Sequence, residues 1–143
     1  MPFVLVWKPV LRELRLADYH PDFGNETITV CVNPSPEMVR RRDDLIEQNA
    51  IRFTRTVEPA TAKKKQERIL EAKGKIDEYT RWMNDVYHVQ MDQWFAELWS
   101  FGVEKYTVET IKEYRDVDPA FVNWLFVQSI EMIKEHNTGK KNS

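Results

Sequence analysis

The chain has 143 residues, of which 42% are hydrophobic and 31% are charged, with a formal net charge of -2. This balance is too apolar for a disordered tail and too charged for a membrane protein, and it excludes bulk attraction to nucleic acid or anionic lipid as the main driving force for binding. The single cysteine, Cys31, excludes an internal disulfide and multi-cysteine zinc modules. The length predicts one domain overall.

Residues 1–33 have the pattern of a small β-element. In residues 27–32 apolar and polar side chains alternate, which predicts a half-buried strand with Ile28, Val30 and Val32 on one face. We expect this strand to pair with residues 11–17 or with the apolar run 3–7, in a two- or three-stranded antiparallel arrangement. The same pattern favours a buried, inert thiol at Cys31.

Residues 34–136 form a predicted helical region. Ser35 followed by Pro36 is typical of a helix start, and that helix is expected to end near residue 50, before a linker at 52–62. Two further starts are Thr107, before a helix over 108–115, and Asp118, before a helix that ends near His136. Residues 137–143 are expected to be a disordered tail. The predicted fold class is mainly α (α+β), with an N-terminal β-element followed by a helical bundle.

A long central helix is predicted at about 61–100. Its apolar residues recur at steps of three or four, which places them in one stripe. Forty helical residues would span about 60 Å, so we expect a protruding hairpin or a break, with Gly74 as the weakest point. Gly102 is expected to end this helix in a left-handed conformation.

Catalytic motifs are not evident, and we expect neither an enzyme nor a bound cofactor or metal. The best metal-ligand candidates are Asp85, His88 and Asp92, spaced to share one helix face. Only half of a di-iron signature is present, so we interpret the acidic residues as a surface stripe. Nucleic-acid binding is not expected either. The basic run 63–65 lacks interleaved aromatic residues, and the run 40–42 is offset by Asp43 and Asp44. Whether these runs form one surface stays open.

Aromatic residues are the most unusual feature. Five of them are the candidates for contact with a protein partner, although each is equally compatible with a core position. They are Trp82, Trp94, Trp99, Phe121 and Trp124. No apolar run reaches the length of a membrane span and the N-terminus does not resemble a signal peptide, so we expect no membrane contact and a cytoplasmic location.

The order of these elements resembles the small tail assembly chaperones of long-tailed bacteriophages and prophages. The resemblance covers most of residues 7–135. It lies in the order of the elements and in the residues at which they begin and end. Its elements are a short strand pair ending in an Asn-Pro step, a helix, a central helix ending in a Trp-containing stretch, a Thr-x-Glu turn-helix and a C-terminal helix that starts near a proline. Here these are residues 19–23 with 28–34, Met38 onward, 94–99, 107–109 and 118–121.

The resemblance implies a non-catalytic protein. Such a chaperone would bind the long, coiled tape measure protein in the host cytoplasm and keep it soluble until tail-tube subunits polymerise around it. The alternative is another helical adaptor, or a subunit of a larger phage or host complex. Self-association is expected for a chaperone without its partner, and the oligomeric state stays open.

Overall fold

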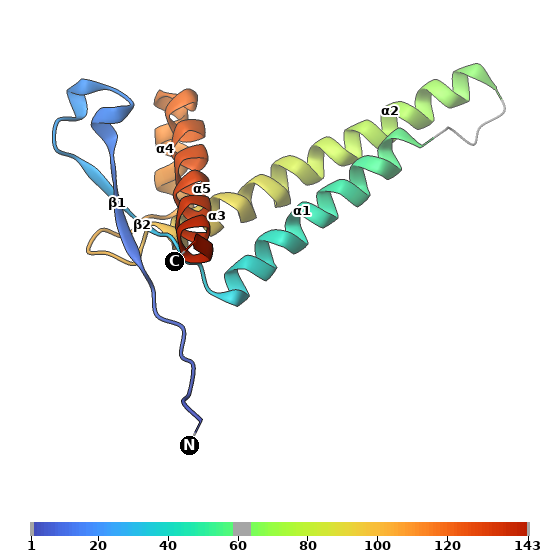
Figure 1. Ribbon diagram of the computed structural model, residues 1–143. Helices are drawn as coiled ribbons and strands as arrows, with labels where there is room; N and C mark the ends of the chain where they lie inside the picture. Colours follow the sequence, from blue (N-terminus) through green and yellow to red (C-terminus); the bar gives the residue numbers. More distant parts are fainter. Residues whose placement is uncertain (1, 59–63, 143) are drawn as a thin grey trace. The chain divides into compact units, whose positions relative to one another are not determined.

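The computed structural model describes residues 2–58 and 64–142 (Figure 1). It is 70% helical, with a two-stranded antiparallel sheet near the N-terminus followed by helices, which confirms the predicted fold class. The chain divides into two compact units. Residues 1–38 together with 92–143 form unit 1, and residues 39–91 form unit 2. The β-element and the C-terminal helices therefore belong to the same unit.

The sheet consists of β1 (Leu11–Arg15) and β2 (Thr27–Cys31), which lie side by side in unit 1 (Figure 1). Leu14 pairs with Ile28 in the antiparallel register. Two short 3-10 helices, η1 (Leu16–Asp18) and η2 (Pro21–Phe23), connect the strands. Ile28, Val30 and Val32 are buried, as the alternation predicted, and Cys31 is a buried free thiol whose pKa is raised by burial.

The apolar run at residues 3–7 is not a strand, which corrects the second pairing option. Phe3, Val4, Leu5 and Val6 are 69–87% exposed. Trp7, the last residue of this run, is less exposed, at 38%, and its indole Nε1 donates to the carbonyl of Asn33 at 2.8 Å. β-branched residues favour extended backbone, but a strand also requires a partner, and here the neighbouring strand pairs with residues 11–15 instead.

The core of unit 1 is built around two tryptophans, Trp94 in α3 (His88–Leu98) and Trp99, which directly follows this helix. Trp94 donates its indole N–H to the carbonyl of Met38 at 2.8 Å, and Trp99 donates to Ser129 Oγ at 2.9 Å. Phe95 stacks on Phe126 with ring centroids 4.0 Å apart. The fully buried large side chains include Trp94, Leu98, Trp99, Ile111 and Leu125.

The predicted helix starts at Ser35, Thr107 and Asp118 are confirmed. Each side chain accepts a hydrogen bond from the backbone N–H three residues later, at 3.2 Å in all three cases. These caps satisfy amide groups that have no partner inside the helix. The helices that follow are α1 (Pro36–Val57), α4 (Val108–Val117) and α5 (Pro119–Asn142).

Two helices extend further than the sequence predicted. α1 continues to Val57 rather than ending near residue 50. The hydroxyls of Thr54 and Thr56 donate to carbonyls one turn earlier, so the helix accommodates both residues. The rest of the predicted linker, from residue 59, lies outside the described residues. α5 continues to Asn142 instead of giving way to a disordered tail after His136. No proline interrupts it.

The long central helix is confirmed from Lys65 to Leu98. It consists of α2 (Lys65–Trp82), a π-helical turn η3 (Met83–Tyr87) and α3. Of the two expected alternatives, a hairpin or a break, Gly74 gives no break, since α2 passes through this residue. The irregularity is the wider turn of η3. Within residues 2–58 and 64–142, no helix is both long enough and apolar enough to cross a membrane.

The predicted left-handed conformation of Gly102 is wrong, because its φ is not positive. Among the described residues only Gly24 has a positive φ, at 59°. The role of Gly102 is close packing. A Cβ at position 102 would lie 2.8 Å from Oγ1 of Thr29 and 3.1 Å from its Cβ. The Thr29 hydroxyl donates to Glu13 at 2.8 Å, which limits how far it can move.

The two glycines should respond oppositely to alanine. Gly74→Ala is expected to raise the free energy of unfolding by about 0.5 to 1 kcal/mol, because the helix interior favours alanine and a Cβ there meets nothing within 4 Å. Gly102→Ala is expected to lower it by about 1 to 3 kcal/mol through the clash with Thr29. Urea denaturation followed by circular dichroism measures both, and equal stabilisation by the two changes would refute the close approach.

Candidate functional site

The five aromatic residues predicted to contact a partner fall in both units. Trp94, Trp99 and Phe121 are buried in unit 1 and Trp124 is partly exposed. Trp124 and Phe121 stack at 6.3 Å, so both belong to one aromatic cluster. Trp82 lies in unit 2. In this conformation the indoles of Trp94 and Trp99 serve the core rather than a surface.

Trp82 is enclosed by side chains of its own unit. Its ring centroid lies 6.4 Å from that of Tyr79 and 5.7 Å from that of Tyr87. The guanidinium carbon of Arg52 lies 4.7 Å from the ring centroid, which is a cation–π contact. Trp82 therefore connects α2 to α1 by packing.

α1 and α2 lie side by side as an antiparallel helical hairpin in unit 2 (Figure 1). Phe53 of α1 contacts Tyr79 of α2 edge to face, with ring centroids 6.0 Å apart. The Tyr79 hydroxyl also donates to Asn49 Oδ1. Tyr79 is therefore the side chain that fixes the separation of the two helices at this level.

Large apolar side chains along this hairpin stay about half exposed, and we call them the hairpin stripe. They recur at steps of seven or four, which places them on one face of each helix. The members are Ile46, Phe53 and Val57 on α1 and Ile69 and Ile76 on α2, all 48–61% exposed. Two helices alone do not cover these side chains.

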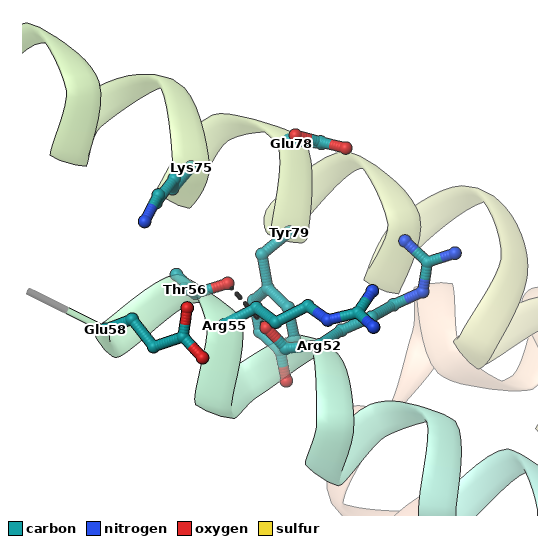
Figure 2. Close-up of a pocket in the computed structure, with 7 residues that line it drawn as sticks. All are labelled: Arg52, Arg55, Thr56, Glu58, Lys75, Glu78 and Tyr79. Carbon is teal, nitrogen blue, oxygen red and sulfur yellow. Dashed lines mark hydrogen bonds between the residues drawn. The ribbon is translucent and has the colours of Figure 1, made fainter. Parts of the chain in front are cut away.

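A pocket of about 380 Å³ lies between the two helices beside Tyr79. Figure 2 shows Tyr79 reaching from α2 toward α1, with charged side chains around it. The lining residues are Arg52, Arg55, Thr56, Glu58, Lys75, Glu78 and Tyr79. Both signs of charge are present, an arrangement suited to the flanking charges of an amphipathic helix.

Asp92, one of the three metal-ligand candidates, forms an ion pair with Arg115. Its two carboxylate oxygens accept from Arg115 at 2.8 and 2.9 Å, and the residue is only 3% exposed. The hydrogen bond to Asp92 raises the pKa of Arg115. The interpretation of Asp92 as part of a solvated surface stripe is therefore wrong, because a partner 23 residues later in the chain pairs with it.

Lys63 of the second basic run lies outside the described residues. Among the described residues, no group of three or more His, Cys, Asp and Glu side chains is arranged to hold a metal ion.

Sequence reasoning missed Phe53 and Val57 as surface candidates, since residues 52–62 were expected to be a linker. The signal was the spacing of Ile46, Phe53 and Val57, which continues the apolar period of the preceding helix.

Comparison with known proteins gave no match to any family model, curated protein or solved structure. The hairpin stripe is therefore identified by its geometry and exposure alone.

The Asp92–Arg115 pair should be coupled in stability measurements. Arg115→Met is expected to lower the free energy of unfolding by about 3 kcal/mol, because it leaves a buried carboxylate without its partner. Adding Asp92→Leu should recover most of that loss, since an apolar pair of similar volume replaces the ion pair. Chemical denaturation of the two single variants and the double variant tests this. Additive losses would contradict the coupling.

Proposed function

We propose that this protein is a non-catalytic binding protein that holds an amphipathic helix of a larger protein against the α1–α2 hairpin. The specific form of the proposal is a phage tail assembly chaperone acting in the host cytoplasm, with the tape measure protein as its client. The element order of the chain supports the chaperone, and the hairpin stripe supports the kind of segment that is bound.

The half-exposed hairpin stripe is the observation that carries the proposal. In a helical coiled coil, apolar residues at these spacings pack into the facing helix and lose most of their contact with water. Here five large side chains on two adjacent helices keep about half of their surface exposed. A third helix with its own apolar stripe would cover them, which is helix-in-groove recognition.

The affinity expected from this surface is modest. Covering the exposed half of each stripe side chain contributes about 1 kcal/mol, and the entropy cost of association offsets part of the sum. The mixed charges beside Tyr79 add selectivity more than affinity. Weak, reversible binding suits a chaperone, because its client must be released as the tail tube assembles.

Removing apolar surface from the hairpin should abolish client capture without unfolding the protein. We expect the double variant Phe53→Ser/Ile76→Ser to lose the client in an affinity pull-down from native cells with prophages induced, read by mass spectrometry. Both side chains are about half exposed, so loss of the Phe53–Tyr79 ring contact should lower stability without unfolding the protein, as circular dichroism can verify. Val103→Ser is the matched control, since Val103 is 95% exposed and lies in unit 1.

The identity of the captured protein decides the specific form. Recovery of a very long, helix-rich tail protein by the wild type and by Val103→Ser, but not by the hairpin variant, is the expected result. Recovery of a defined host or phage complex instead would favour the adaptor alternative. Equal capture by all three proteins would overturn the hairpin as the contact surface.

A further inference from the structure

A second pocket, of about 420 Å³, lies wholly within unit 1 and has a different chemistry. Its apolar base is formed by Leu16, Ile28 and Phe121, all of them buried. Phe23 stacks on Phe121 with ring centroids 5.0 Å apart and an interplanar angle of 18°. The volume is within the range of sites that enclose small ligands or single large side chains.

The polar groups of this pocket are all acidic or neutral. Glu26 and Asp118 contribute carboxylates, Tyr106 and Tyr114 contribute phenol hydroxyls, and no lysine, arginine or histidine is among the lining residues. Burial, with nearby carboxylates, raises the pKa of Tyr106 to about 12, and burial also raises that of Tyr114. Both phenols are therefore neutral at pH 7, so the carboxylates supply the charge of the pocket.

Asp118 is held in place by several contacts. The Tyr19 hydroxyl donates to its Oδ2 at 2.7 Å, and the backbone N–H of Phe121 donates to its Oδ1 at 3.2 Å. Carboxylate oxygens have more than one acceptor site each, so these contacts orient the group and leave capacity for another donor. An oriented carboxylate beside aromatic faces favours a cation, because both attract positive charge.

We propose that this pocket binds a hydrophobic cation, namely an aromatic or aliphatic group that carries a protonated amine. The apolar part lies on Leu16, Ile28 and Phe121, and the ammonium group is directed to Glu26 and Asp118. Such a cation is either a free amine or a lysine beside an apolar residue in a protein segment. The site lies in a different unit from the hairpin stripe and does not depend on it.

Titration with three small probes tests the charge preference. We expect 2-phenylethylammonium to bind, as followed by chemical-shift changes of the Ile28 and Leu16 methyl groups in NMR spectra. Phenylacetate has a similar ring with the opposite charge, and 2-phenylethanol is neutral, so both should bind at least about fivefold more weakly. Equal or tighter binding of phenylacetate would overturn the proposal, as would no binding of the ammonium probe.

Variants locate the site of the cation. Glu26→Gln and Asp118→Asn should each weaken binding of 2-phenylethylammonium by about twofold to fivefold, and asparagine retains the helix cap at position 118. Glu109→Gln removes the same charge from an α4 residue outside the pocket lining and should leave binding unchanged. Equal effects of all three variants would indicate a general charge effect and refute the site.

The two sources of the cation are separated by one comparison. The dipeptide acetyl-Phe-Lys-amide has its only positive charge on a lysine side chain, whereas 2-phenylethylammonium is a free amine. Tighter binding of the dipeptide assigns the pocket to a protein segment, and tighter binding of the amine assigns it to a small molecule. Loss of client capture by the hairpin variant has no bearing on either result, so failure of the two proposals can be distinguished.

Discussion

Two indole N–H groups constrain how unit 1 packs. Trp94 and Trp99 are buried, and an indole N–H removed from water requires an acceptor. Trp94 finds it in the carbonyl of Met38 and Trp99 in the hydroxyl of Ser129, so α3 is joined at once to the start of α1 and to α5. The close approach of Gly102 to Thr29 then brings the segment after α3 against β2.

Unit 2 buries few of its apolar side chains. In its described part, 39–58 and 64–91, the buried apolar residues are Leu45 and Trp82, while the hairpin stripe stays half exposed. Unit 1 buries Trp94, Trp99 and Phe121, whereas unit 2 keeps the five large apolar side chains of the hairpin stripe about half exposed. The core positions of Trp94 and Trp99 and the exposure of the hairpin stripe support the hairpin as the partner surface. The acidic pocket of unit 1 is a separate feature with its own ligand chemistry.

Local features of the fold could be predicted from the sequence, and long-range ones could not. Alternation identified the strand at 27–32, and capping chemistry identified Ser35, Thr107 and Asp118, because both depend on neighbouring residues. The pairing of Asp92 with Arg115 and the packing of Gly102 on Thr29 join distant parts of the chain, so spacing alone suggested a surface acid and a left-handed turn. The hairpin stripe was missed because residues 52–62 were predicted to be a linker, although the hydroxyls of Thr54 and Thr56 bond within the helix.

We propose that the exposed apolar side chains of the α1–α2 hairpin hold a helix of the client. The most direct test places photoreactive p-benzoylphenylalanine at Phe53 and irradiates cells in which the client is produced. The account predicts crosslinks to an amphipathic helical segment of a long tail protein, and none to that segment when the same residue is placed at Val103. Crosslinks to the same segment from both positions, or none from Phe53 while the client is still captured, would contradict it.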